Sequence, residues 1–194
     1  MNAIQTNLAG PLILEPRVFG DDRGFFFESW NEKRFKSITG LSVGFVQDNH
    51  SRSARGVLRG LHFQCRFPQG KLVRVTSGSV WDVAVDVRVD SPSFGQYIAC
   101  ELSAENHRQL WIPAGFAHGF LVLSDSADFL YKTTAYWMPE HERSLLWNDP
   151  AIGIQWPLDR LSGKQPTLAA KDASAQTLAE LEQSGDLLCL DHAS

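Results

Sequence analysis

The chain has 194 residues, of which 43% are hydrophobic and 21% charged, so it is long enough for one globular domain with a substantial core. Its formal net charge is −4 at pH 7, and this acidity argues against a nucleic-acid-binding domain, which spreads basic charge over a whole face. No apolar run is long enough to cross a bilayer, and the N-terminal residues lack the basic start of a signal peptide, so we expect no membrane partner.

The three cysteines, Cys65, Cys100 and Cys189, are odd in number and far apart in the sequence. Their spacing matches neither a redox pair nor a metal site. This usage is typical of a reducing compartment, and we expect a cytoplasmic protein.

Short apolar or alternating runs, cut by turn residues, predict an all-β protein. A short helix is expected first, over Asn31–Ser37. Eight strands follow, over Val43–Gln47, Val57–Gln64, Lys71–Thr76, Val80–Val87, Gln96–Leu102, Arg108–Ile112, Ala117–Leu123 and Ala127–Thr134. An amphipathic helix over Ser174–Gln183 comes last, with Gly185 as its stop.

Eight strands of this kind are typical of a jelly-roll barrel. We expect a single domain over residues 1–194, with a core from about 10 to 160 and a C-terminal segment, 161–194, packed on it.

The clearest alternation lies in the predicted strand Val80–Val87, whose odd and even positions would face opposite sides of a sheet. One side would carry Trp81, Val83, Val85 and Val87, and the other Val80, Asp82, Ala84 and Asp86. This period of two predicts a strand that is buried on one face.

Between Asn49 and Trp81 the chain has no Asp or Glu, although it is acidic as a whole. The same stretch contains the cationic residues Arg52, Arg55, Arg59, Arg66, Lys71 and Arg74. Local positive charge predicts an anion site, and His62 within the stretch offers a base for proton transfer near neutral pH. Together they indicate an enzyme for a phosphorylated or nucleotide-linked substrate; the alternative is a solvated strand face.

The segment Pro113–His118 matches half of the metal-binding cupin pattern, in which a Pro-x-Gly turn precedes a histidine on a barrel strand. The other half, a His-x-His pair and a Glu, is reduced here to His62 and Gln64, and no acid follows until Asp82. Zinc and iron sites need three protein ligands, so we expect no metal and a barrel that uses organic acid–base chemistry.

A series of segments extends this comparison in order from about residue 10 to residue 175: Asp21–Glu28, Phe45–Ser51, Gly56–Gln64, Gly70–Val75, Arg108–Phe120, Phe129–Thr134, Pro139–Arg143, Ser162 and Lys171–Asp172. In these segments the chain resembles the dTDP-4-dehydrorhamnose 3,5-epimerase family, which is of the metal-free cupin type. The resemblance implies a cupin-like jelly-roll barrel, a homodimer and no cofactor.

The implied substrate is a dTDP-linked 4-keto-6-deoxy sugar, whose hydrogens at C3 and C5 are acidified by the C4 ketone. A base removes a proton, an enolate forms, and an acid returns a proton on the opposite face, which feeds dTDP-rhamnose synthesis. The alternatives are a mono-epimerase acting at C3 or C5 only, a 3,4-ketoisomerase, a non-catalytic sugar-nucleotide-binding module and a metal-dependent cupin oxygenase.

The resemblance assigns four catalytic residues: His62 as the base, Asp172 as its carboxylate partner, Tyr131 as the acid and Lys71 as the cation beside the ketone oxygen. Asp82 is a further candidate, to orient Lys71. Structural roles are the alternatives. His62 and Tyr131 would pack in the core, Lys71 would lie at the surface, and Asp172 would cap the C-terminal helix.

Further positions match substrate-binding residues of the family: Arg23, Glu28, Gln47, Asn49, Arg59, His118, Glu142 and Lys171. Trp137 departs from the family, which usually has a tyrosine there that stacks on thymine, although the larger indole ring can also stack. Glu28 and Glu142 could equally be surface charges, and Asn49 a turn former.

In a strictly alternating strand, Arg59 and His62 face opposite sides. Both can reach one pocket only if Gly60 marks a bulge or a bend in the strand, as glycines in strands often do.

Overall fold

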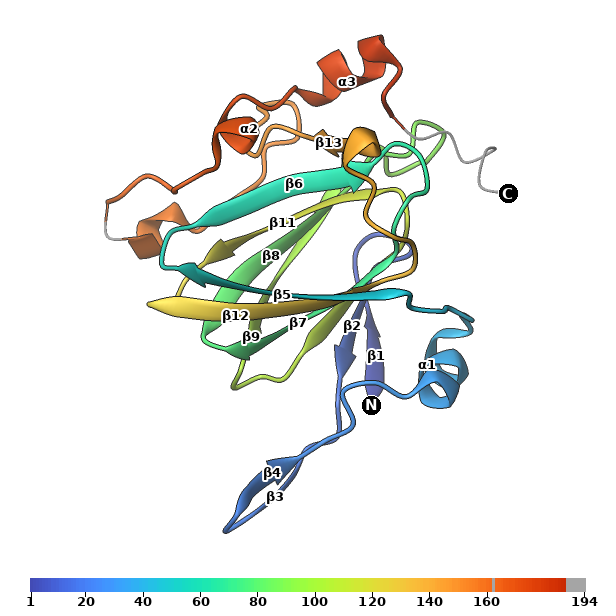
Figure 1. The fold of residues 1–194 in the computed structure, drawn as a ribbon, viewed down its shortest axis with the longest axis vertical. Coiled ribbons are helices and arrows are strands. Elements are labelled where there is room, and N and C mark those ends of the chain that lie inside the picture. Colours follow the sequence, from blue (N-terminus) through green and yellow to red (C-terminus); the bar gives the residue numbers. More distant parts are fainter. Residues whose placement is uncertain (162, 188–194) are drawn as a thin grey trace.

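Two antiparallel β-sheets face each other and form a jelly-roll barrel, which confirms the expected all-β class with a few short helices (Figure 1). The computed structural model describes residues 1–161 and 163–187. One sheet has the order β1 (Asn2–Gln5), β2 (Leu12–Glu15), β10 (Gln109–Ile112), β7 (Lys71–Ser77), β12 (Ser126–Thr133) and β5 (Gln47–Ala54). The other has the order β13 (Glu142–Ser144), β6 (Leu58–Gln64), β11 (Phe116–Val122), β8 (Ser79–Asp86) and β9 (Tyr97–Ser103).

Strands β6 to β12 match the seven strands predicted from Val57 onward, each to within one residue at either end. The first predicted strand, Val43–Gln47, is wrong: residues 43–46 are not in a strand, and β5 runs instead over Gln47–Ala54. Val43 and Phe45 pack in a hydrophobic cluster with Phe35 and Trp111. Their apolar pattern therefore reflects packing outside the sheets.

Strand β8 separates two hydrophobic clusters. Val80 and Ala84 face the barrel interior with Phe120 and Phe129, whereas Val83 and Val85 belong to a second cluster on the outer side of the five-stranded sheet. The predicted alternation is confirmed, but the expectation of a single buried face is wrong. The strand is buried on both faces because the C-terminal part of the chain covers the outer one.

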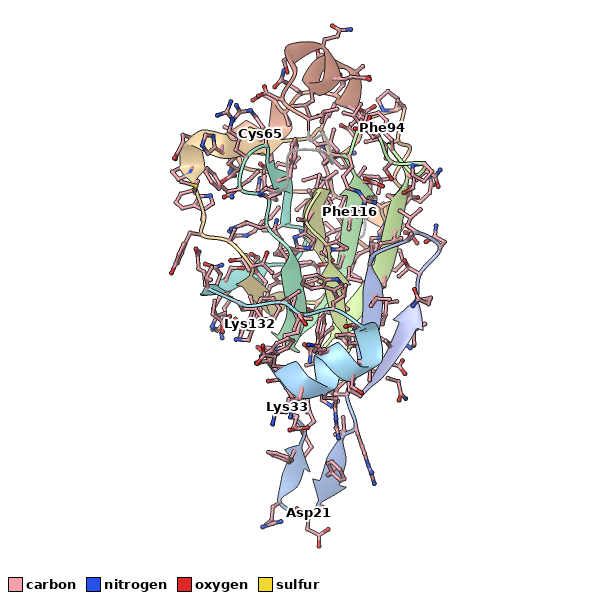
Figure 2. All side chains as sticks on the ribbon, turned by 90° about the vertical axis from the view of Figure 1, so that its right-hand side faces the viewer. Asp21, Lys33, Cys65, Phe94, Phe116 and Lys132 are labelled. Carbon is pink, nitrogen blue, oxygen red and sulfur yellow. The ribbon has the colours of Figure 1, made fainter. Side chains whose placement is uncertain are left out.

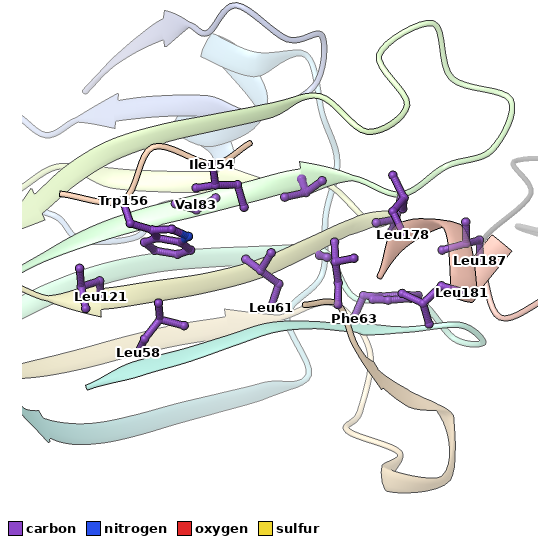
Figure 3. Close-up of a cluster of buried hydrophobic side chains, with 14 of the residues drawn as sticks. Leu58, Leu61, Phe63, Val83, Leu121, Ile154, Trp156, Leu178, Leu181 and Leu187 are labelled. Atoms are coloured by element: carbon purple, nitrogen blue, oxygen red, sulfur yellow. The ribbon is translucent and has the colours of Figure 1, made fainter. Parts of the chain in front are cut away.

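The covering residues include Ile154, Trp156, Leu178 and Leu181, which form one buried cluster with Leu61 and Phe63 of β6 (Figure 3). Further along the segment, the helices α2 (Ala170–Ala173) and α3 (Leu178–Ser184) lie over β6 (Figure 1). The segment is held by backbone bonds between Thr167 and both Gly56 and Leu58, and between Leu146 and Gln176.

Helix α1 (Glu32–Thr39) begins after Asn31, whose side chain accepts from the backbone N–H of Arg34, and ends at Gly40. The C-terminal helix starts later than predicted, at Leu178, because Thr177 and Glu180 form a capping box there. None of the helices in the described part of the chain is long and apolar enough to cross a membrane.

A β-hairpin of β3 (Phe19–Asp21) and β4 (Gly24–Phe26) projects from the barrel near α1 (Figure 1). Figure 2 shows Asp21 at its tip, away from the body of the molecule. Phe25 and Phe26 are each more than 60% exposed on it. Of the cysteines, Cys65 and Cys100 are free, and Cys189 lies outside the described residues.

Candidate active site

A cavity of about 590 Å³ opens between the two sheets. It is lined by ten of the predicted site residues: Asn49, Arg59, His62, Lys71, His118, Tyr131, Trp137, Glu142, Lys171 and Asp172. Gln47 lines an adjoining hollow of about 340 Å³ that shares His62, Tyr131 and Trp137 with it. The fold thus gathers residues that are up to 125 positions apart in the sequence, from six strands, the loop that carries Trp137 and the C-terminal segment.

The predicted bulge or bend at Gly60 is confirmed, because the pairing of β6 with β11 shifts register between His118 and Phe120. Gly60 has a φ of +109°, and a Cβ added there would lie 2.6 Å from the carbonyl oxygen of His118. The shift lets Arg59 and His62 line the same cavity. Glycine is needed here for the close approach of the two backbones as well as for the backbone angle.

His62 is braced by a buried carboxylate. Its Nε2 lies 2.7 Å from Oδ1 of Asp172, and the other carboxylate oxygen accepts from the backbone N–H of Gly60 at 3.3 Å. Burial alone would raise the pKa of Asp172, but the bonds from His62 and Gly60 lower it overall. Asp172 is therefore an ionised acceptor, so Nε2 of His62 carries the proton and Nδ1 of a neutral ring is left free.

The alternative role of Asp172 as a helix cap is wrong. It lies inside α2, and Thr177 caps α3. The segment that carries it is fixed by backbone bonds at Thr167 and Gln176, on either side of the carboxylate.

Lys71 is buried, with 7% of its surface exposed, which rules out the alternative of a surface lysine. Its Nζ donates to the backbone carbonyl of His62 at 3.2 Å, so the ammonium group is held at the backbone of the residue whose imidazole lines the same cavity. Burial lowers the pKa of Lys71 to about 8, while Glu142 and Asp82 act to raise it. At neutral pH, below this value, the group is a cation in a buried position, where charge acts more strongly than in water.

Tyr131 is half-buried on β12, opposite Asn49 of β5. Burial raises the pKa of its phenol, and the nearby Glu142 adds to this effect, while Arg59 opposes it. The hydroxyl therefore keeps its proton at neutral pH and can act as an acid.

A polar network of side chains lies along one side of the cavity, at its mouth. Glu142 accepts from Nε1 of Trp137 at 2.6 Å and pairs with Lys171. The backbone N–H of Trp137 donates to the side chain of Gln47, which in turn donates to Asn49. Trp137 is 55% exposed, so its ring is held by these bonds yet remains partly open to solvent.

Gln64 also lines the cavity, although the sequence suggested it only as a residue standing where a metal-binding cupin has a histidine. Its buried amide accepts from the backbone N–H of Met138 at 2.7 Å and donates to the carbonyl of Tyr136, which fixes the segment that carries Trp137. The sequence did contain an indication of this role. Gln64 is a polar residue at the end of an apolar strand, and a buried polar side chain needs hydrogen-bond partners.

His118 forms a buried pair with Asp82. Its Nε2 lies 3.1 Å and 3.0 Å from the two carboxylate oxygens. Burial lowers the pKa of His118, and this outweighs the opposing effect of Asp82. Burial likewise raises the pKa of Asp82.

Arg23 and Glu28 do not line the cavity. Arg23 lies on the projecting hairpin with its side chain 89% exposed and pairs with Asp21. Glu28 bonds to Asn31 and Arg34 beside α1. Within one chain, the structure therefore separates these two predicted binding residues from the other eleven site residues.

Among residues 1–161 and 163–187, no three His, Cys, Asp or Glu side chains gather as a metal-ion set. The cavity instead offers a braced imidazole, a protonated phenol and a buried ammonium group. These are the parts of a site that moves protons next to a carbonyl group.

Comparison with known proteins assigns the family. The family model described as dTDP-4-dehydrorhamnose 3,5-epimerase matches residues 5–180. A dTDP-4-dehydrorhamnose 3,5-epimerase of Pseudomonas aeruginosa is 59% identical over 182 residues, which cover 94% of this chain and 98% of that protein. An epimerase structure from Legionella pneumophila, in complex with dTDP-4-keto-L-rhamnose, superposes with a TM-score of 0.91 at 52% identity and 97% coverage of both chains.

A more distant structure is also similar. A 3'-monoepimerase of Streptomyces bikiniensis, in complex with dTDP-quinovose, has a TM-score of 0.88 at 32% identity, over 98% of this chain and 94% of that one. The family model covers most of the chain, and the relatives match it over nearly their whole length, so the chain belongs to the dTDP-4-dehydrorhamnose 3,5-epimerase family, whose members are isomerases.

Proposed function

We propose that the chain inverts both C3 and C5 of dTDP-4-dehydro-6-deoxy-D-glucose and so forms dTDP-4-dehydro-L-rhamnose. The dTDP-sugar substrate is supported by family membership and by the ligand held in the Legionella relative. The observation that carries the mechanism is that a braced imidazole, a buried ammonium group and a protonated phenol border one cavity.

His62 is the base. With Nε2–H bonded to Asp172, the free Nδ1 takes the proton from carbon, and the carboxylate stabilises the imidazolium that forms. The electron pair of the broken C–H bond moves onto the C4 oxygen as an enolate. The imidazolium then returns to the neutral form by losing its proton to solvent.

Lys71 stabilises the enolate oxygen. Its ammonium group is already desolvated and fixed by the carbonyl of His62, so it needs no reorganisation when charge develops. Such preorganised stabilisation contributes roughly 3 kcal/mol to lowering the barrier.

Tyr131 returns a proton to carbon on the face opposite His62. The C–H bond re-forms with inverted configuration, and the phenolate is reprotonated from solvent. The raised pKa of the phenol suits this role, because it holds the proton until a strongly basic carbon is presented.

The nucleotide part lies toward the mouth of the cavity. Arg59 and Lys171 are the cations for the diphosphate, and Arg59 is oriented by its bond to Ser53. Trp137 stacks on the base, while Gln47 and Asn49 offer amide groups to its edge or to the sugar.

The active form is a homodimer in which the β3–β4 hairpin of each subunit reaches the cavity of its partner. Three features support this arrangement: the hairpin projects from its own barrel, exposes Phe25 and Phe26, and carries Arg23 (Figure 1). Exposed aromatic side chains on a projecting element are typical of a protein interface.

Incubation of the protein with dTDP-4-keto-6-deoxyglucose in deuterated water tests the reaction. Deuterium at both C3 and C5 supports double epimerisation, and none at either carbon in folded protein refutes it. His62→Ala should abolish incorporation at both carbons, whereas the control His141→Ala, outside the cavity, should keep it. Incorporation at one carbon only would instead indicate a mono-epimerase, a class that shares this fold in Streptomyces bikiniensis.

A further inference from the structure

The cavity contains a second histidine–carboxylate pair that the proposed mechanism does not use. Asp82 of β8 and His118 of β11 lie on neighbouring strands of the five-stranded sheet, and both oxygens of Asp82 are within hydrogen-bond distance of Nε2 of His118. His118 lines the cavity, whereas Asp82 is fully buried and does not. Asp82 can therefore affect the reaction only through the groups that it touches or faces.

We propose that Asp82 is a positioning residue for the epimerisation proposed above: as a carboxylate bonded to His118, it fixes the tautomer of that ring and supplies a negative charge that helps to keep Lys71 an ammonium group beside the substrate ketone. Its side chain is completely inaccessible, with both oxygens committed to one imidazole. A carboxylate in such a place costs stability unless it balances a positive charge.

The tautomer of His118 follows from this contact. An ionised Asp82 accepts the Nε2–H, and in the described part of the chain no hydrogen bond is formed by Nδ1 of His118. The burial of the ring keeps it neutral, so Nδ1 is an acceptor, which suits a sugar hydroxyl.

The charge balance around Lys71 involves groups from several strands. Glu142 of β13 and Asp82 of β8 both act to keep it charged, while His62 of β6 and His118 of β11 lie beside it. Glu142 is already bonded to Lys171 and Trp137 at the mouth, so its charge is shared.

Cys100 of β9 also faces Asp82, but burial raises the pKa of its thiol, and it adds no charge. Asp82 is thus the anion buried with Lys71 on the inner side.

The test uses Asp82→Asn, which keeps an oxygen for Nε2–H of His118 but removes the charge. Loss of a nearby negative charge lowers the pKa of Lys71, so the alkaline limb of kcat/KM should move to lower pH by roughly one unit. The matched control is Asp86→Asn, four residues along β8 on the same face, because Asp86 is equally buried but its carboxylate, within the part of the chain that the structure describes, bonds to Arg88, Ser91 and Ser93 and not to His118. It should lower the melting temperature and leave the alkaline limb in place.

An unmoved alkaline limb in folded Asp82→Asn overturns the proposal. This result is distinct from a failure of the proposed function, in which the wild-type protein itself would incorporate no deuterium.

A measurement on the wild-type protein covers the case in which Asp82→Asn does not fold. Nitrogen-15 NMR of histidine-labelled protein, with the signal of His118 assigned through His118→Gln, should show a neutral ring protonated at Nε2 throughout pH 6 to 9. A doubly protonated ring at pH 7, or a proton on Nδ1, would overturn the proposal.

Discussion

At Lys71 the chain buries an ammonium group that would be better solvated in water. The unfolded chain has a lysine pKa near 10.5, and burial lowers the folded value to about 8. Between these values the unfolded state binds more protons than the folded state. The cost of burying the charge is therefore present in full below pH 8 and is relieved as the pH rises to 10.5.

Activity and stability should respond to pH in opposite senses through this one residue. We expect kcat/KM of the wild-type protein to fall above pH 8, as the ammonium group is lost. Over the same range, the free energy of unfolding contributed by Lys71 rises, by an amount on the order of 3 kcal/mol.

Lys71→Met isolates this effect because it keeps the length of the side chain without the charge. At pH 7 the variant should be more stable than wild type by up to about 3 kcal/mol in urea unfolding, and this difference should shrink at pH 10. Its activity should be lower by roughly 10²–10³-fold, as on loss of one preorganised group. A variant that is less stable than wild type at pH 7, or equally active, would contradict this account of Lys71.

Among the elements, strand β6 depends on one glycine for its shape. We expect Gly60→Ala to destabilise the protein by at least about 2 kcal/mol, since the added methyl group meets backbone atoms that cannot move aside. Gly44→Ala is the control, because a Cβ there meets nothing within 4 Å. The midpoints of urea unfolding compare the two, and similar midpoints would mean that the bulge tolerates a side chain.

The C-terminal segment is an element whose packing sets the position of Asp172. Leu181 of α3 is fully buried against the outer face of the five-stranded sheet (Figure 3). Leu181→Ala should cost about 2–5 kcal/mol, and kcat should fall as the His62–Asp172 contact loosens. Leu41→Ala, at a position that is 38% exposed, should change neither quantity. An unchanged kcat in folded Leu181→Ala would show that Asp172 is positioned by the backbone bonds alone.

At the scale of the whole molecule, the barrel was predictable wherever apolar alternation was present. The prediction of strands failed at β5, because a strand that lines a polar cavity has no apolar face to recognise. The inward positions of β5 are Gln47, Asn49, Ser51 and Ser53. The pairing of His62 with Asp172, 110 residues away, came from the family resemblance, since local spacing carries no information on such a contact. The pairing of Asp82 with His118 was not foreseen for the same reason.

The dimer is testable by complementation between two defective subunits. Arg23→Ala and His62→Ala homodimers should each be nearly inactive. Random exchange of their subunits would give heterodimers with one intact cavity, and about a quarter of the wild-type activity should return. No recovery of activity after verified exchange of subunits, or a monomer in light scattering, would contradict the proposal that the hairpin reaches the cavity of the partner subunit.

Strand β5 pairs with β12 on one side only, so it is an edge of the six-stranded sheet. Unpaired edges invite aggregation, and natural proteins protect them with charged side chains. The outward positions of β5 are Asp48, His50, Arg52 and the small Ala54, all exposed, while the inward ones carry amides and hydroxyls, of which Asn49 and Ser51 line the cavity. The same absence of apolar residues thus serves recognition and solubility together. Apolar substitutions in β5, made to accept a more apolar sugar, would therefore make this sheet edge more prone to self-association. New charged residues on its outer face would be needed to compensate.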